Sequence, residues 1–186
     1  ALAITDECSL AGVVRAHGVA KKHGLPIIIG AHFHLRQHDG RPALSLIALA
    51  QNRNGYGNLS EMITLARTRS EKGSYLIHPD DFAAPAPEYA HLKGLPDCLL
   101  ILLPTYPGHE ALDVDRLHMQ AAWMAAHFPG RCWIGLNLLH RAFDEAHRLT
   151  VEEVALQHRM PVTAVGNVCM HVRSRKPMHD TLCAIR

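Results

Sequence analysis

Residues 27–34 read Ile-Ile-Ile-Gly-Ala-His-Phe-His, and this stretch decides the fold class. Three consecutive β-branched residues favour a strand, and Gly24 and Pro26 end the helical pattern that precedes them. A turn at 38–40, His-Asp-Gly, leads to Leu44–Ala50, which suits an antiparallel partner strand. Because helical patterns flank this strand pair on both sides, the sequence indicates an α/β fold.

Towards the N-terminus, residues 1–4 predict a buried strand, and Ser9 is expected to cap the helix that follows. The expected inward face of that helix is Leu10, Val13, Val14 and Ala20. Further along, Asn58 is expected to cap a second helix. Its expected inward face is Leu59, Met62, Ile63 and Ala66, and its expected outer face is Arg67, Arg69, Glu71 and Lys72.

The second half of the sequence continues the alternation of strands and helices. Residues 79–97 are rich in proline and alanine and predict an irregular surface excursion. The remaining expected strands are 98–103, 132–139 and 161–165, and the remaining expected helices are 114–127, 144–159 and a last one from about 177. Repeated strand–helix units favour one domain over 1–186, with a mostly parallel sheet and outer helices, either open or closed into a barrel.

Composition narrows the class of protein. Of the 186 residues, 48% are hydrophobic and 19% charged, as in ordinary globular domains. The net charge of +2 makes no overall case for an acidic partner, so any nucleic-acid contact would depend on local basic patches. The 15 histidines raise the question of metal binding without answering it.

The five cysteines are widely spaced and include no C-x-x-C pair, which argues against a disulfide scaffold and a zinc finger. This usage indicates a reducing, cytoplasmic compartment. No signal peptide is evident, and the longest apolar run, 98–103, is too short to cross a membrane. Both ends of the chain interrupt expected elements, so we expect a fragment of a longer protein.

Three of the expected strands carry metal-capable side chains towards their ends, where chemistry gathers in parallel-sheet folds. They are Asp6 and Glu7 after the first strand, His32 and His34 on the second, and Asn167, Cys169 and His171 after the last. A multi-metal hydrolase needs imidazoles and carboxylates that converge from different strands. The alternative is that Asp6 caps a turn, Cys169 packs in the core, and the two histidines of the second strand lie at the surface. For those two histidines we favour the surface interpretation.

Several segments together resemble a known family. They are Ala-Leu-Ala-Ile-Thr-Asp-Glu-Cys-Ser at 1–9, Ile-Gly-Ala-His-Phe at 29–33, Met-His-Val-Arg-Ser-Arg-Lys at 170–176, and Asp-Thr-Leu-Cys-Ala-Ile-Arg at 180–186. The chain resembles the PHP (polymerase and histidinol phosphatase) domain of bacterial error-prone DNA polymerases. These are C-family enzymes related to the DNA polymerase III alpha subunit. The resemblance implies a distorted (β/α) barrel.

The departures from the family pattern concern the metal site. Family members with an intact site carry an H-x-H motif on a strand before the segment where this chain begins. Glu7 stands where they have histidine, His32 where they have a bridging glutamate, and Asn167 and Cys169 where they have D-x-H. Asp6 is the matched position. The resemblance therefore implies a degenerate site at Asp6, Glu7, His32 and Cys169, with zinc or manganese bound weakly or not at all.

The resemblance also implies the setting of the domain. The parent would be a DNA-directed DNA polymerase of damage-tolerant synthesis, with magnesium in its palm, and this chain its non-catalytic, structural or partner-binding module. The expected partners are the rest of the polymerase, DNA through the parent, and other mutasome or replisome proteins, with no membrane. Arg173, Arg175 and Lys176 form one basic run and Arg67, Arg69 and Lys72 another, for which contact between domains is favoured over nucleic acid. The alternative function is a metal-dependent phosphoesterase, either a pyrophosphatase or a proofreading-like nuclease.

Overall fold

A computed structural model describes residues 1–106, 112–166, 168 and 170–185. Six strands form one sheet, and their order in the sheet is their order in the chain. The strands are β1 (Leu2–Ile4), β2 (Ile27–Arg36), β3 (Pro42–Ala50), β4 (Cys98–Leu103), β5 (Cys132–Leu136) and β6 (Val162–Ala164). The helices are α1 (Val13–Lys22), α2 (Arg53–Thr68), α3 (Asp80–Ala83), α4 (Val114–His127), α5 (Asp144–Gln157) and α6 (Lys176–Ile185), with 3₁₀ turns η1 (Pro87–Leu92) and η2 (Arg173–Arg175).

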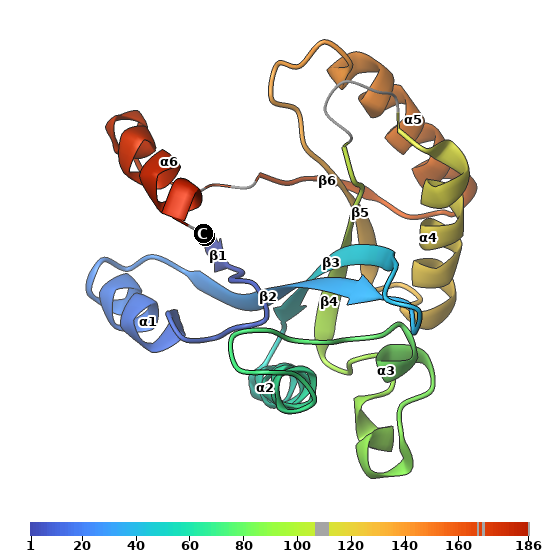
Figure 1. The fold of residues 1–186 in the computed structure, drawn as a ribbon, viewed down its shortest axis with the longest axis horizontal. Coiled ribbons are helices and arrows are strands. Elements are labelled where there is room, and N and C mark those ends of the chain that lie inside the picture. The colour runs from blue at the N-terminus through green and yellow to red at the C-terminus, as the bar shows by residue number, and fades with distance from the viewer. Residues whose placement is uncertain (107–111, 167, 169, 186) are drawn as a thin grey trace.

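The pairing of the strands confirms the expected α/β class with a mostly parallel sheet. β1 pairs with β2 in parallel, and β4, β5 and β6 pair in parallel. β3 runs antiparallel to both of its neighbours, β2 and β4. Five strands therefore point the same way and end at the same edge of the sheet. The sheet curls into a half-barrel. In Figure 1, α2 and α3 lie below the sheet, and α4 and α5 lie to the right of β5.

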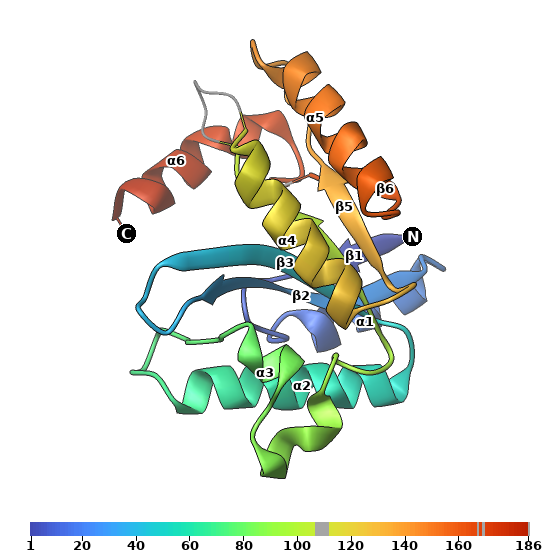
Figure 2. The same ribbon diagram turned by 90° about the vertical axis from the view of Figure 1, so that its right-hand side faces the viewer.

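One face of the sheet carries the core. Alternate residues of the central strands are fully buried, which is the period of two that a strand imposes. They include Phe33 of β2, Leu46 of β3 and Leu100 of β4. Helix α2 runs below these strands in Figure 2 and adds Leu59, Met62 and Ala66, spaced three and four residues apart on one side of the helix. The opposite, concave face of the sheet is only partly covered, which leaves room for a site.

Both helix starts expected in the first half of the chain are wrong. α1 begins at Val13, and Ser9 does not cap it, because Ser9 Oγ accepts the Ala11 N–H in the turn before the helix. Val14, which was expected on the inward face, is 80% exposed. α2 begins at Arg53, where Asn52 Oδ1 accepts the Gly55 N–H at 3.0 Å.

Asn58 therefore lies inside α2, and its side-chain amide donates to the Pro96 carbonyl at 3.0 Å. Asn58 therefore ties α2 to a distant loop and does not cap the helix.

Two segments are buried differently from the sequence-based expectation. The first strand lies at an edge of the sheet and has only β2 as a neighbour, so Leu2 is 53% exposed. The region 79–97 is ordered into α3 and η1, and it contributes Phe82, Leu92 and Leu95 to the core. The Phe82 ring packs edge-on against the Phe128 ring, and 5.9 Å separates the two ring centroids. The proline-rich composition thus marks short turns of helix rather than a loose excursion.

The basic residues at the end of α2 do not form an outer face. Arg67 donates to the Cys8 carbonyl from Nε at 3.1 Å and from Nη2 at 3.0 Å, and it also reaches the carbonyls of Glu7 and Ser74. Arg69 forms a bidentate ion pair with Asp81. Both guanidinium groups therefore hold this domain together. Lys72, by contrast, makes no hydrogen bond or ion pair within the described residues. Among the described helices, none combines the length and apolarity needed to cross a bilayer.

Candidate functional site at the strand ends

The carboxyl ends of the parallel strands surround a cavity of about 170 Å³ on the concave face of the sheet. We call it the strand-end cavity. Its lining comes from residues at or near the ends of β1, β4, β5 and β6, together with His32 from the middle of β2 and Ile47 of β3. The described lining residues are Thr5, His32, Ile47, Leu103, Pro104, Tyr106, Gly135, Asn137, Val165 and Gly166. This is the position at which α/β folds gather their ligands.

His32 supplies an imidazole to the strand-end cavity. Its Nε2 atom is shielded from solvent and has no hydrogen-bond partner within the described part of the chain. Burial, as the larger cause, and the neighbouring His34 together lower the pKa of His32 to about 4, although Glu7 opposes the shift. The ring is therefore neutral at pH 7 and keeps a free nitrogen. The surface interpretation thus holds for His34, which is exposed, and is wrong for His32.

Glu7 lies beside His32, because the two residues are paired partners in a parallel bridge that extends the β1–β2 ladder. Its carboxylate is engaged: the Tyr75 hydroxyl donates to Glu7 Oε1 at 2.9 Å and accepts the His34 N–H at 3.0 Å. Burial raises the pKa of Tyr75, so its hydroxyl remains a donor. Glu7 thus places a carboxylate beside His32, and a neighbouring tyrosine orients it.

Asp6 faces the other way. Successive residues of an extended chain point to opposite faces, and Thr5 lines the strand-end cavity. The Asp6 carboxylate turns instead towards the start of α1, where Oδ2 lies 3.4 Å from the position that a Cβ on Gly12 would take. The structure therefore brings Glu7 and His32 together and does not bring Asp6 with them.

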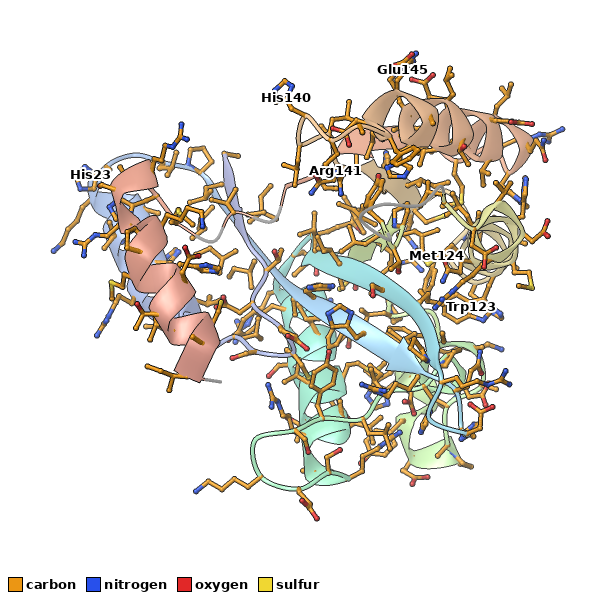
Figure 3. All side chains as sticks on the ribbon, turned by 45° about the horizontal axis from the view of Figure 1, so that its top comes forward. His23, Trp123, Met124, His140, Arg141 and Glu145 are labelled. Atoms are coloured by element: carbon orange, nitrogen blue, oxygen red, sulfur yellow. The ribbon has the colours of Figure 1, made fainter. Side chains whose placement is uncertain are left out.

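Asn137 and Tyr106 belong to the same cavity, although the sequence analysis did not single them out. Asn137 Oδ1 is buried without a hydrogen-bond partner among the described residues, and its backbone N–H donates to the Tyr106 hydroxyl at 3.2 Å. Arg141 stacks over the Tyr106 ring at 4.5 Å and donates to the Asn137 carbonyl at 2.7 Å. Figure 3 shows Arg141 in the segment just before α5. The available signal was position, since both residues follow a parallel strand within three residues.

The comparisons with known proteins agree with this architecture. The sequence pattern of the PHP domain matches residues 1–127, which is more than half of the chain. The chain belongs to the PHP domain family. The crystal structure of a "putative metal-dependent phosphoesterase" from Bifidobacterium adolescentis shares the fold, with a TM-score of 0.51 and 14% sequence identity. That alignment covers 87% of this chain and 74% of the other.

Curated relatives of this PHP domain are named error-prone DNA polymerases. The one from Bordetella parapertussis is 57% identical over 186 residues, and those from Ralstonia nicotianae and Methylococcus capsulatus are 51% and 40% identical. Each alignment covers the whole of this chain but only 16–17% of the relative. The chain thus spans about one sixth of the length of these relatives.

The donor set that the described residues of this PHP domain offer fits a metal cluster poorly. Within the described residues, no three His, Cys, Asp or Glu side chains come together in a way that could hold a metal ion. Asn167 and Cys169 lie outside the residues that the structure describes. The strand-end cavity offers a neutral imidazole, an amide oxygen and, beside them, one carboxylate. Divalent cations such as Mn²⁺ prefer carboxylate oxygens, and a site for two cations needs negative charge to offset their repulsion.

The C-terminal basic run of the PHP domain is exposed. Arg173 and Arg175 lie in η2 and Lys176 begins α6, and no residue of either element is buried. Lys176 pairs with Asp180 on the next turn of α6 at 2.6 Å. The two arginines have no acidic partner among the described residues. Their side chains are therefore available to a partner surface or to phosphate groups.

Proposed function

We propose that this chain is the PHP module of an error-prone DNA polymerase and that it supports the polymerase structurally, without phosphoester chemistry of its own. The observation that carries the proposal is the neutral character of the strand-end cavity. Metal-dependent hydrolysis needs cations that activate water and stabilise the charge developing on phosphate oxygens. Here His32 and Asn137 supply uncharged atoms, and Glu7 is held by Tyr75 at the margin.

The structural role has its own support. The identity of 40–57% to error-prone DNA polymerases extends over the whole chain, and those relatives are about six times as long. Exposed basic and apolar side chains of η2 and α6, such as Arg173, Arg175 and Met178, give the module a surface for the rest of the polymerase. DNA contact would then be made through the parent chain.

Metal analysis of the chain together with a phosphodiester hydrolysis assay tests the proposal. We expect less than one zinc or manganese ion per chain and no hydrolysis above the buffer control. A stoichiometric metal content, with hydrolysis that disappears in His32→Ala, would show that the proposal is wrong.

DNA synthesis by the full-length polymerase tests the supporting role. His32→Ala changes the strand-end cavity and should leave template-directed synthesis unchanged. Gly55→Ala should lower synthesis, because it disrupts the packing of α2 against the loop before β4. Equal synthesis by both variants would argue that the module does not support the polymerase.

A metal-dependent phosphoesterase is the second candidate function. It is favoured by one observation, the shielded Nε2 atom of His32, which has no hydrogen-bond partner among the described residues and is not protonated at neutral pH. A neutral imidazole nitrogen of this kind is the form that ligates zinc or manganese. The same assays decide between the two candidates, because only the phosphoesterase requires both bound metal and His32-dependent hydrolysis.

A further inference from the structure

A second cavity adjoins the strand-end cavity, and its chemistry is different. It has a volume of about 150 Å³, and we call it the Arg36–Arg116 pocket. Its lining residues are His34, Leu35, Arg36, Pro42, Leu44, Ser45, Thr105 and Arg116. The linings of the two cavities are neighbours in two places. The rings of His32 and His34 lie 4.3 Å apart, and Thr105 lines one cavity while its chain neighbours line the other.

The polar side chains of the Arg36–Arg116 pocket all suit an anion. Two guanidinium groups, two hydroxyl groups and an imidazole line it, and none of its lining residues is acidic. Neither Arg36 nor Arg116 forms an ion pair within the described part of the chain, whereas Arg41, Arg69, Arg141 and Arg148 each do. Two unpaired guanidinium groups beside one cavity repel each other unless an anion joins them.

Backbone contacts fix both guanidinium groups at the end of the β2–β3 hairpin. Arg36 Nη1 donates to the Gly40 carbonyl at 3.2 Å, and Arg116 Nη2 donates to the Pro42 carbonyl at 3.0 Å. One turn further along α4, Gln120 Nε2 donates to the Ala43 carbonyl at 2.6 Å. These hydrogen bonds attach α4 to the hairpin close to the point where the β2–β3 register shifts, between Leu35 and Arg36. Irregularities of this kind commonly re-aim a side chain next to a functional site.

The arginines retain donors for a ligand. A guanidinium group has five N–H donors, and one of them on each arginine is committed to a backbone carbonyl. Ser45 Oγ lies 2.7 Å from His34 Nδ1, so the hydroxyl and the imidazole hold each other in place. Three described carboxylates of this region have partners: Asp39 pairs with Arg41, Asp80 with His38, and Asp113 Oδ1 accepts the backbone N–H of Arg116.

We propose that the Arg36–Arg116 pocket binds a phosphate group. Fixed, planar guanidinium donors that converge with hydroxyl groups form the arrangement that recognises phosphate oxygens by charge-assisted hydrogen bonds. The phosphate can belong to free inorganic phosphate or to a nucleotide, whose uncharged part would then face the neutral strand-end cavity. This binding does not depend on a metal at the strand ends, so it stands or falls separately from the proposed function.

Calorimetric titration of the chain with inorganic phosphate, dAMP and adenosine tests the proposal. We expect inorganic phosphate or dAMP to bind, and adenosine, which lacks phosphate, to bind at least about tenfold more weakly. Tighter binding of dAMP than of inorganic phosphate identifies a nucleotide as the source of the phosphate, and equal binding identifies the free ion. Absence of binding by both phosphate compounds, or adenosine binding as tight as that of dAMP, would overturn the proposal.

Substitutions locate the site. Arg36→Gln and Arg116→Gln should each weaken phosphate binding about tenfold or more, because each removes charged donors from the pocket. Arg41→Gln is the matched control, since Arg41 lies on the same hairpin, pairs with Asp39 and does not line the pocket. Arg36 is exposed, so its variant should retain the thermal unfolding curve even if Arg116→Gln loosens the hairpin. Equal losses in Arg36→Gln and Arg41→Gln would mean diffuse charge attraction and would overturn the proposal.

Discussion

At the scale of single residues, His32 is a partly buried imidazole on the wall of the strand-end cavity. Its pKa of about 4 lies below the value of 6.5 expected in the unfolded chain. The folded chain therefore binds fewer protons than the unfolded chain between these two values, and stability falls as the pH drops through this window. The shift corresponds to about 3 kcal/mol of unfolding free energy, present above pH 6.5 and lost towards pH 4.

Urea unfolding of the chain and of His32→Gln at several pH values measures this contribution. We expect the stability of the chain relative to His32→Gln to fall by about 3 kcal/mol from pH 7.5 to pH 4. His23→Gln is the control, because it removes an exposed imidazole at the end of α1 that does not line the cavity, and it should follow the unsubstituted chain. Figure 3 shows His23 at the periphery of the molecule. A constant difference between the chain and His32→Gln across this range would contradict the burial of the ring.

The environment of His32 shows why the site could be predicted only in part. Its position within β2 follows from local sequence, as does the position of Glu7 after β1. The burial of its ring depends on Leu103, Gly135 and Val165, which line the cavity from β4, β5 and the end of β6. These residues lie 71 to 133 positions further along the chain, and no local pattern shows that they will surround His32. The sequence therefore identified His32 as a candidate ligand, but it did not show that the ring is neutral and shielded from solvent.

At the scale of elements, the helices separate into those set by local pattern and those set by distant contacts. The bounds expected for α4 match the structure, because its amphipathic pattern begins directly after a capping aspartate, Asp113. The start of α2 could not be predicted in the same way. Gly55 and Gly57 both lower the local helix propensity, yet the helix already includes them. Gly55 has a structural reason: the backbone of Asp97, more than 40 residues away in the sequence, occupies the space that a Cβ at this position would need.

The two glycines of α2 form a matched pair for experiment. A Cβ on Gly55 would lie within 2.0 Å of the Asp97 carbonyl oxygen, whereas a Cβ on Gly57 would meet nothing within 4 Å. Gly55→Ala should therefore lower the free energy of unfolding by at least about 2 kcal/mol, by forcing the helix away from the loop. Gly57→Ala should raise it by up to about 1 kcal/mol, because alanine has the higher helix propensity. Chemical denaturation of both variants makes the comparison, and a Gly55→Ala chain as stable as Gly57→Ala would contradict the close approach.

At the scale of the whole molecule, stability is concentrated in the central strands and declines towards the C-terminal helix. β3 and β4 have a neighbour on each side, and their alternate side chains are fully buried. α6 contains no buried residue, although Met178, Leu182 and Ile185 give it an apolar side. The helix thus contributes little to the folded state of this chain, and it is free to present that side to another surface.

The same substitution at two leucines tests this gradient. Leu46→Ala in β3 removes a side chain with no exposed surface and should cost about 2–5 kcal/mol of unfolding free energy. Leu182→Ala in α6 removes a side chain that is 58% exposed and should change it by less than about 0.5 kcal/mol. Native-state hydrogen exchange should agree, with α6 amides opening at a small fraction of the global unfolding free energy and β3 amides opening only near its full value. Comparable losses at the two leucines, or equal protection of the two elements, would show that α6 is packed against the domain in solution.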